Sequence, residues 1–311
     1  MLDVRRMRVL REVATQGSFS AAADALSYTQ SAVSQQIAAL EREAGTKLVE
    51  RSARGIRLTD AGEALVRHTE AVLANLAEAE AELEALAGVR GGRVRLASFP
   101  SAGSAIVPQA IANFRSRHPA VDLAMIEAEP EESLPRVRSG ELEIALVYTP
   151  SMLSNEGLAG FDVEDLLDDP FYVVLPKGHP MAERPRIRLK DLASEPWING
   201  TGACPCSYQV RRACNNAGFD PHVAFESDDF AAVQGLVAAG VGVALIPDLG
   251  FATVRDDIAI CKLAPSEAMS RTVQAATLPG YRSPATQAML DVLRETAEIY
   301  RSARVELAVA S

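Results

Sequence analysis

The segment from Thr59 to about Ala87 constrains the fold more than any other part of the chain. It contains no proline, Thr59 is suited to cap a helix, and Asp60 and Glu63 suit the positive end of the helix dipole. Alternating spacings of four and three residues define a heptad seam, which consists of Leu65, Thr69, Val72, Leu76, Ala79, Leu83 and Leu86. We therefore predict one helix about 42 Å long. Its seam packs either on its own chain or on a second copy.

Length and charge limit what the rest of the chain can be. With 311 residues, two or three domains are expected, because a single core rarely organises so many residues. The formal net charge of -10 argues against a protein that coats nucleic acid through bulk positive charge. Residues 1–58 are the exception, because nine Lys and Arg against six Asp and Glu give a net charge of +3. Contact with nucleic acid is therefore expected there.

The sequence offers no segment suited to secretion or to a membrane. The stretch from Leu10 to Gln16 follows an arginine-rich start but contains Arg11 and Glu12, so it cannot form the apolar core of a signal peptide. No apolar run reaches the length of a membrane-spanning helix. The four cysteines are too few for a disulfide scaffold. We predict a cytoplasmic protein without membrane contact.

Three shorter helices are predicted ahead of the long one. The first lies between Asp3 and Gly17, the second is capped by Ser18 or Ser20, and the third covers about residues 31–44. Polar, uncharged side chains that can meet base edges gather at the start of the third helix: Gln30, Ser31, Ser34 and Gln35. This composition is what a recognition helix in a DNA groove requires.

A hairpin is predicted after the third helix, with strands at about 48–51 and 56–58. Arg51, Arg54 and Arg57 lie on or beside it, where they could neutralise phosphates without reading sequence. The hairpin would then be the wing of a winged helix-turn-helix. An ordinary solvated hairpin is the alternative.

The motifs of this N-terminal segment follow one another at the spacing of a single family. They include GSFSAA at 17–22, TQSAVSQQI at 29–37 and LTDAG at 58–62. In these motifs the segment resembles the LysR-type transcriptional regulators. One departure is Val49, where the family commonly has phenylalanine; it bears on the packing of the wing and hardly on DNA contact.

The resemblance implies a winged helix-turn-helix at 1–58 that binds double-stranded promoter DNA, and a linker helix at 59–90 that pairs between subunits of a dimer or tetramer. RNA polymerase is a further partner that the resemblance implies. The predicted DNA contacts are Ser20, Thr29, Gln30, Ser31, Ser34, Gln35, Arg51, Arg54 and Arg57. The predicted oligomer contacts are Leu65, Val72, Leu76, Ala79, Leu83 and Leu86.

Strands and helices alternate beyond residue 91, which predicts an α/β architecture. A helix is expected over 101–117, and short apolar strands are expected at 94–97, 121–126, 144–147, 171–175 and 243–246. The pattern resembles the LysR-type effector domain, itself like a periplasmic solute-binding fold, in the motifs GELEIA, LPKGHP and VAAGVGVALIP. The resemblance implies an effector domain at 91–302, with lobe I at 91–161 and 267–302, lobe II at 162–266, and a C-terminal tail at 303–311.

A small-molecule effector is expected between the lobes, near helix N-termini whose free N–H groups bind anions. The predicted contacts are Ser98, Ser101, Thr201, Gly202 and Ser227, with Asp228 at the same border. The alternative for Ser98 and Ser101 is that they only cap the helix. No nucleotide cofactor is predicted, because neither Gly200–Gly202 nor Gly240–Gly242 completes a phosphate-binding motif.

Thiol chemistry offers a second way of sensing. Cys204, Cys206 and Cys214 lie where peroxide-sensing members of the family carry reactive cysteines, and Arg211 and Arg212 would lower a thiol pKa. The intervals between the cysteines differ from those members, and a free cysteine is often only a small buried residue. Redox sensing is therefore kept as an alternative. A metal site is not predicted, since no histidine lies close in sequence.

An enzyme and a transport protein are the competing classes. The four histidines are scattered, at His68, His118, His179 and His222, and no nucleophile motif accompanies them, so no catalytic residue is predicted. A transport protein would need a secretion signal and no helix-turn-helix. We predict a transcriptional regulator in which effector binding changes lobe closure or subunit packing, and so alters DNA binding or bending.

Overall fold

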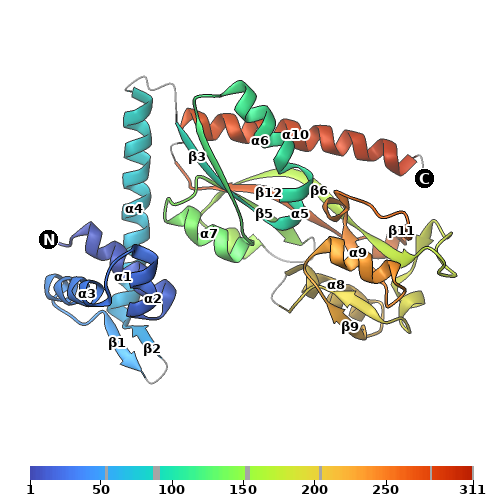
Figure 1. The fold of residues 1–311 in the computed structure, drawn as a ribbon, viewed down its shortest axis with the longest axis horizontal. Coiled ribbons are helices and arrows are strands. Elements are labelled where there is room, and N and C mark those ends of the chain that lie inside the picture. The colour runs from blue at the N-terminus through green and yellow to red at the C-terminus, as the bar shows by residue number, and fades with distance from the viewer. Residues whose placement is uncertain (53–54, 87–91, 151–154, 203–204, 281, 310–311) are drawn as a thin grey trace. The chain divides into compact units, whose positions relative to one another are not determined.

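The computed structural model describes residues 1–52, 55–86, 92–150, 155–202, 205–280 and 282–309 (Figure 1). The chain forms two compact units, one built on residues 1–88 and the other on 89–137 and 142–311. Among the described helices, none combines the length and the apolar character that crossing a membrane demands.

The first unit contains four helices and a hairpin. Their bounds are α1 (Val4–Gln16), α2 (Phe19–Leu26), α3 (Gln30–Ala44), β1 (Val49–Ser52), β2 (Gly55–Leu58) and α4 (Asp60–Leu86). The strands β1 and β2 pair antiparallel. This order is that of a winged helix-turn-helix followed by a long helix, as the sequence predicts.

Local capping chemistry fixes the ends of these helices. The Asp3 carboxylate accepts the N–H groups of the first turn of α1, and Gly17 ends that helix in the left-handed region at φ 65°. Ser18, and not Ser20, caps α2 through its hydroxyl. Thr29 caps α3 by accepting from the Ala32 N–H at 3.2 Å, which starts the helix one residue earlier than predicted.

The core of the first unit joins all its helices. Its buried side chains come from α1, α2, α3, the segment before β1 and the start of α4, and include Leu10, Val13, Ala22, Ile37, Leu40, Leu48 and Leu65. The chain passes so close at Gly62 that a methyl group there would overlap the Leu48 carbonyl oxygen. The start of α4 is therefore held firmly against the hairpin strand β1 and the segment before it.

The heptad seam of α4 divides into two parts. Leu65 is buried in the core of its own unit, Val72 packs at its edge, and the buried Thr69 hydroxyl donates to the Leu65 carbonyl. Leu76 and Leu83 are 46% and 65% exposed. The prediction of Leu65 as an oligomer contact is therefore corrected, because its side chain is already covered by its own unit. The side chain of Leu86 lies outside the described residues.

The second unit begins with a lobe built on one sheet. Its strands follow the order β4 (Asp122–Glu127), β3 (Arg93–Ser98), β5 (Ile144–Pro150), β12 (Ser270–Thr277) and β6 (Asp162–Pro176). The strands β3, β4 and β5 are parallel, whereas β12 runs antiparallel to both β5 and β6. Helices α6 (Val107–Arg117) and α10 (Pro284–Val309) lie against one another beside this sheet (Figure 1), and α7 (Pro130–Arg138) packs on its other face.

The helix predicted over 101–117 is in fact two helices, α5 (Pro100–Ala105) and α6. The break falls at Ile106 because Pro108 has no N–H to donate and its ring would clash with the carbonyl one turn earlier. A second correction concerns the C-terminus, where α10 continues to Val309. Residue 303, where the sequence predicts a separate tail to begin, therefore lies inside this helix.

The second lobe is built around the other half of β6. Residues 171–174 of this strand pair with β10 (Ala244–Pro247), and residues 172–176 pair with β11 (Ile258–Leu263), which in turn pairs with β7 (Arg186–Ile187). The parallel pair β8 (Trp197–Asn199) and β9 (Val223–Glu226) and the helices α8 (Pro205–Asn216) and α9 (Phe230–Ala238) complete it. Short helical turns follow at η1 (Asn155–Leu158), η2 (Leu189–Leu192), η3 (Asp248–Phe251) and η4 (Pro265–Glu267).

The boundary between the lobes lies inside β6. Residues 162–170 pair with β12 and so belong to the sheet of the first lobe, although the sequence places the start of lobe II at 162. The chain returns to the first lobe between β11 and β12. The composition of β6 changes near this boundary, from five acidic residues within 162–169 to the apolar run FYVVL at 171–175. Composition alone does not say which strands pair with each half, so the sequence does not place the boundary.

Candidate functional site

The start of α3 presents the polar face that the sequence predicts. Gln30, Ser31 and Gln35 are exposed and Ser34 is half-buried, while the opposite face of α3 is buried in the core. Ser20 and Thr29 are also exposed, and the Thr29 hydroxyl is engaged as the helix cap. Amide and hydroxyl groups at one helix end are suited to base edges in a major groove.

An aromatic side chain that the sequence analysis passed over lies beside this face. Tyr28 is 53% exposed in the turn between α2 and α3, next to Ser27, whose φ of 55° is left-handed. The signal in the sequence that could have identified Tyr28 is its position, because it stands between two predicted helices, just before the recognition helix.

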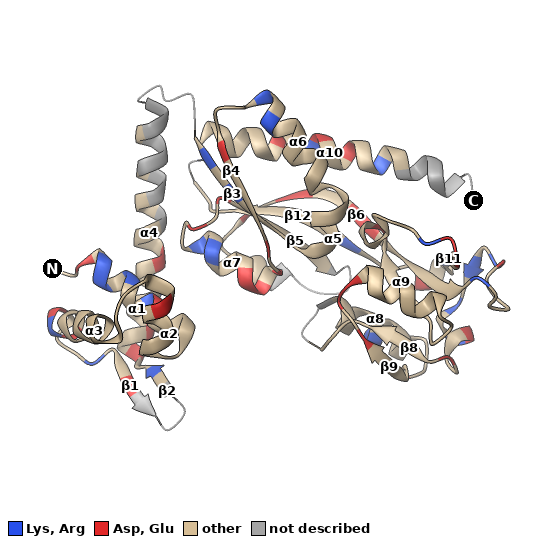
Figure 2. Cartoon of the chain, in the orientation of Figure 1, with Lys and Arg blue, Asp and Glu red and all other residues tan. Residues whose placement is uncertain are grey.

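The basic residues of the first unit are spread out. Figure 2 shows them on α1, near the end of α3 and on β2, where Arg57 is exposed. Arg54 and the side chain of Arg51 lie outside the described residues. A diffuse charge of this kind contributes affinity for phosphate and little sequence information.

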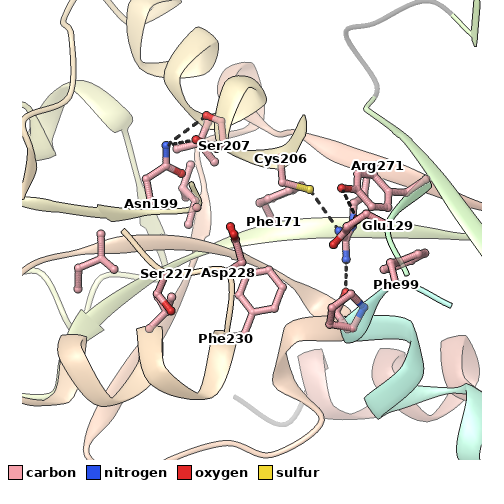
Figure 3. A pocket seen from close by; sticks show the side chains of 18 residues that line it. Phe99, Glu129, Phe171, Asn199, Cys206, Ser207, Ser227, Asp228, Phe230 and Arg271 are labelled. Atoms are coloured by element: carbon pink, nitrogen blue, oxygen red, sulfur yellow. Dashed lines mark hydrogen bonds between the residues drawn. The ribbon is translucent and has the colours of Figure 1, made fainter. Parts of the chain in front are cut away.

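The second unit contains a pocket between its two lobes (Figure 3). It encloses about 560 Å³ of empty space, part of it open to solvent. The first lobe contributes Phe99, Pro100, Ser101, Glu129, Tyr148 and Arg271. The second lobe contributes Phe171, Ile198, Asn199, Gly200, Cys206, Ser207, Val210, Ser227, Asp228, Phe230, Val233 and Leu245. This volume and mixture of apolar walls with few polar groups are typical of small-molecule sites.

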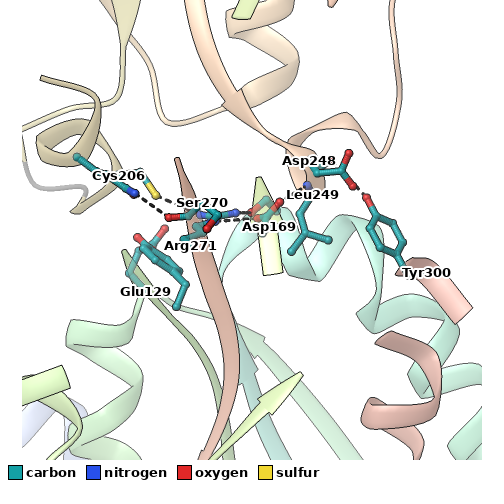
Figure 4. A network of polar contacts seen from close by, with 11 residues as sticks. Glu129, Asp169, Cys206, Asp248, Leu249, Ser270, Arg271 and Tyr300 are labelled. Atoms are coloured by element: carbon teal, nitrogen blue, oxygen red, sulfur yellow. Dashed lines mark hydrogen bonds and ion pairs between the residues drawn. The ribbon is translucent and has the colours of Figure 1, made fainter. Parts of the chain in front are cut away.

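Arg271 of β12 is the centre of the polar contacts at the pocket (Figure 4). Its Nε donates to Asp169 Oδ2 at 2.8 Å, its Nη2 to Ser101 Oγ at 2.6 Å and its Nη1 to Cys206 Sγ at 3.2 Å. The guanidinium carbon lies 4.6 Å from the ring centre of Tyr148 and 5.0 Å from that of Phe99. One side chain therefore joins α5 of the first lobe to α8 of the second.

The partner of this guanidinium is a fully buried carboxylate. Asp169 is 0% exposed and also accepts the Leu249 N–H at 2.9 Å. Burial raises the pKa of Asp169, and the charge of Arg271 opposes that rise. Burial alone would lower the pKa of Arg271, but Cys206 and Asp169 hold it above its ordinary value. The two groups therefore form an ion pair beneath the pocket.

A second set of contacts fixes the rim formed by the second lobe. The Asp228 carboxylate accepts from the Thr201 backbone N–H at 2.8 Å and from its hydroxyl at 2.7 Å. The Asn199 side-chain amide donates to the Ser207 hydroxyl at 3.0 Å. These bonds tie β8 to α8 and to the segment before α9.

The structure brings together only part of the predicted effector site. Ser101 and Ser227 line the pocket, as does Asp228. Ser98 is buried at the end of β3 in the first lobe, and its hydroxyl donates to the Phe99 carbonyl. Thr201 and Gly202 lie next to the pocket without lining it. Neither serine caps α5, because Phe99 holds the cap position without a side-chain bond, so that alternative is wrong.

The thiol of Cys214 does not have the predicted activation. Cys206, Cys214 and Cys261 are buried, and Cys204 lies outside the described residues. Burial, with further repulsion from Asp220 and Glu267, raises the pKa of Cys214 to about 12, which outweighs the opposite effect of Arg211. The expectation that nearby arginines lower this thiol pKa is therefore wrong for Cys214. Burial also raises the pKa of Cys261.

Side chains that could bind a metal ion were also compared. Within the portion of the chain that the structure describes, His, Cys, Asp and Glu side chains form no group of three or more that could hold a metal ion.

A winged helix-turn-helix, a long helix with an exposed seam and a two-lobed domain with an interlobe pocket define a ligand-responsive DNA-binding regulator. The chain belongs to the LysR family. Residues 4–63 match the model of the bacterial regulatory helix-turn-helix proteins of that family, and residues 87–298 match the LysR substrate binding domain.

Known proteins that resemble this chain agree with the family. It is 32% identical to the probable HTH-type transcriptional regulator LrrA of Synechococcus elongatus, over 97% of this chain and 99% of that protein. It is 34% identical to a probable hydrogen peroxide-inducible genes activator of Mycobacterium avium, over 78% and 76%. A full-length OxyR variant from Pseudomonas aeruginosa shares the fold, with a TM-score of 0.67 at 22% identity over 96% of this chain and 95% of that one.

Proposed function

We propose that this LysR-type regulator binds a small-molecule effector in the interlobe pocket, and that occupancy changes how the DNA-binding units engage a promoter. The observation that carries the proposal is the position of Arg271, which contacts Ser101 of one lobe and Cys206 of the other. A ligand that displaces either contact favours a different arrangement of the lobes, so it shifts the equilibrium between two states.

We assign base contacts to α3 and phosphate contacts to the hairpin. Gln30, Ser31 and Gln35 support the first role through their exposure at the helix start. The half-buried Ser34 lies on the same helix, and Ser20 and Thr29 are exposed nearby. Arg57 supports the second, and Arg51 and Arg54 keep the same role by their place in the sequence. In this proposal the protein is not an enzyme and acts in the cytoplasm, where promoter DNA is found.

The exposed half of the α4 seam is proposed as the contact between subunits. Leu76, Ala79 and Leu83 are exposed on a helix that carries many glutamates. A dimer would place two recognition helices on two half-sites.

Selection from a random duplex library tests the DNA-binding part. Full-length protein should enrich a sequence with two related half-sites, centred at a multiple of one helical turn apart. Enrichment of a single unpaired half-site, or of no sequence at all, would contradict a dimeric reader.

Thiol-based sensing is the second candidate. It is favoured by the hydrogen bond of Cys206 to Arg271 and by the similarity to a protein named a hydrogen peroxide-inducible genes activator. The raised pKa of Cys214 counts against that thiol as the reactive one. If peroxide changes operator binding by the wild type and by Cys214→Ser but not by Cys206→Ser, sensing belongs to Cys206.

A further inference from the structure

The charged residues around the pocket are unequal in sign. Among its lining residues Glu129 and Asp228 are acidic and Arg271 alone is basic. Arg271 is in turn paired with the buried Asp169. Three carboxylates therefore stand against one guanidinium, so acidic side chains outnumber basic ones at the pocket and beneath it.

Arg271 is not placed to receive an anionic ligand. The side chain is only 2% exposed, and Asp169, Ser101 and Cys206 accept hydrogen bonds from its three nitrogens. The rings of Tyr148 and Phe99 lie next to its charged carbon. An anion bound at this cation would lie beside Glu129, which Figure 3 shows next to Arg271, and like charge would repel it.

Asp228 has the opposite character. It lies on the exposed rim of the second lobe, and its described partners, the N–H and hydroxyl of Thr201, are uncharged. These bonds hold the carboxylate in place without neutralising it. Figure 3 shows Asp228 and Phe230 together on one side of the pocket, with Glu129, Phe99 and Arg271 on the other. An oriented carboxylate beside aromatic rings is a favourable environment for an ammonium group.

Apart from three serines and one asparagine, the rest of the pocket wall is largely apolar. Phe171, Val210, Val233 and Leu245 all line it, and all four are buried. A ligand body that covers this wall would remove apolar surface from water, which is the main source of affinity in such sites.

We propose that the pocket binds an organic cation, in which a protonated amine lies at Asp228 and an apolar body covers the wall formed by Phe171, Val210, Val233 and Leu245. Glu129 at the far end adds discrimination against acids. The inference rests on the proposed function of the pocket as an effector site, and it names the chemical class of the effector.

Three probes with the same phenyl body and different charge test this preference. Titration calorimetry on the full-length protein would compare phenethylamine, phenethyl alcohol and phenylacetate at neutral pH. We expect phenethylamine to bind at least about tenfold more tightly than phenylacetate, because one charge-assisted hydrogen bond is worth at least that factor. Its affinity should fall as salt is added, since Asp228 is exposed.

Variants locate the charge that is responsible. Asp228→Asn keeps the size of the side chain and should weaken phenethylamine about tenfold while leaving the alcohol unchanged. Asp228→Lys should reverse the order of the amine and the acid. Glu226→Gln is the matched control, since it removes an exposed carboxylate of β9 that does not line the pocket, and it should have no effect.

Three results would overturn the inference: tighter binding of phenylacetate than of phenethylamine, equal affinity of wild type and Asp228→Asn for the amine, or no binding of any probe. None of them bears on operator control by the pocket, which is measured on DNA without a defined ligand. Failure of the cation preference and failure of the proposed function are therefore distinguishable.

Discussion

Arg271 and Asp169 form the buried charge pair on which the pocket depends. Asp169→Asn removes the carboxylate charge that faces the Arg271 guanidinium, and that side chain is only 2% exposed. Removing one partner of a buried pair costs about 3–5 kcal/mol, so the thermal transition of the second unit should move to markedly lower temperature. Asp168→Asn is the matched control, because Asp168 is exposed on the same strand. Equal shifts in the two variants would show that the pair contributes little.

Cys214 predicts a dependence of stability on alkaline pH. Its pKa is raised to about 12 in the folded protein, against 9.0 for a free thiol. The unfolded chain releases this proton first, so between pH 9 and 12 the folded state holds more protons and becomes less stable as pH rises. Chemical unfolding across this window should show a shallower loss for Cys214→Ala than for the wild type. Identical slopes would exclude the thiol as a cause.

Replacing Gln30 and replacing Arg57 should change DNA binding in different ways. Gln30→Ala should reduce discrimination between the selected operator and a scrambled duplex, with a cost of about 1–3 kcal/mol on the operator alone. Arg57→Ala should weaken binding to both duplexes and reduce the salt dependence by about one counterion. Fluorescence anisotropy at several salt concentrations separates the two effects. A uniform loss in both variants would refute the division between base and phosphate contacts.

At the scale of single residues, the sequence predicts well where the chemistry is local. Ser101 lies in the first turn of a helix that follows a strand, and Ser227 lies between a strand and a helix, so their place in the pocket can be predicted from neighbours in sequence. Arg271 could not be found this way, because its partners Asp169 and Ser101 are 102 and 170 residues away. Nothing near Arg271 in sequence distinguishes it from any strand residue.

At the scale of elements, the exposed part of the α4 seam predicts self-association. Leu83→Asp places a charge on a side chain that is 65% exposed in the single chain, so it should not unfold the first unit. It should dissociate the oligomer, because a buried unpaired charge opposes a helix pair. Sedimentation velocity measures the change, with Asn75→Asp as control on an exposed position outside the seam. An unchanged oligomer would exclude this half of α4 from the interface.

The elements of the first unit follow from their caps, and those of the second only in part. Asp3, Gly17 and Ser18 set helix ends through bonds within a few residues, and Gly45 ends α3 by its left-handed conformation, so the sequence predicts these ends closely. The division of the seam depends on tertiary packing of Leu65 against α1 and α3. The lobe boundary inside β6 depends on which strands pair with each half of it, and that is a property of the whole sheet.

At the scale of the whole molecule, we propose that the pocket and the DNA-binding units are two sites of one equilibrium. An effector that binds one lobe arrangement more tightly must shift the population of that arrangement, and operator DNA must alter effector affinity by the same factor. Ser101 tests this link without knowledge of the effector, because its hydroxyl lines the pocket and accepts from Arg271 at 2.6 Å.

The most direct measurement is a nuclease footprint on the selected operator, with and without the dialysable metabolite fraction of the cells that produce the protein. The wild type and the control Ser104→Ala, which alters an exposed serine of the same helix, should both change their footprint when the fraction is added. Ser101→Ala should bind the operator and show no change. A footprint that is the same under all conditions, or one that changes equally in all three proteins, would contradict control of DNA binding through this pocket.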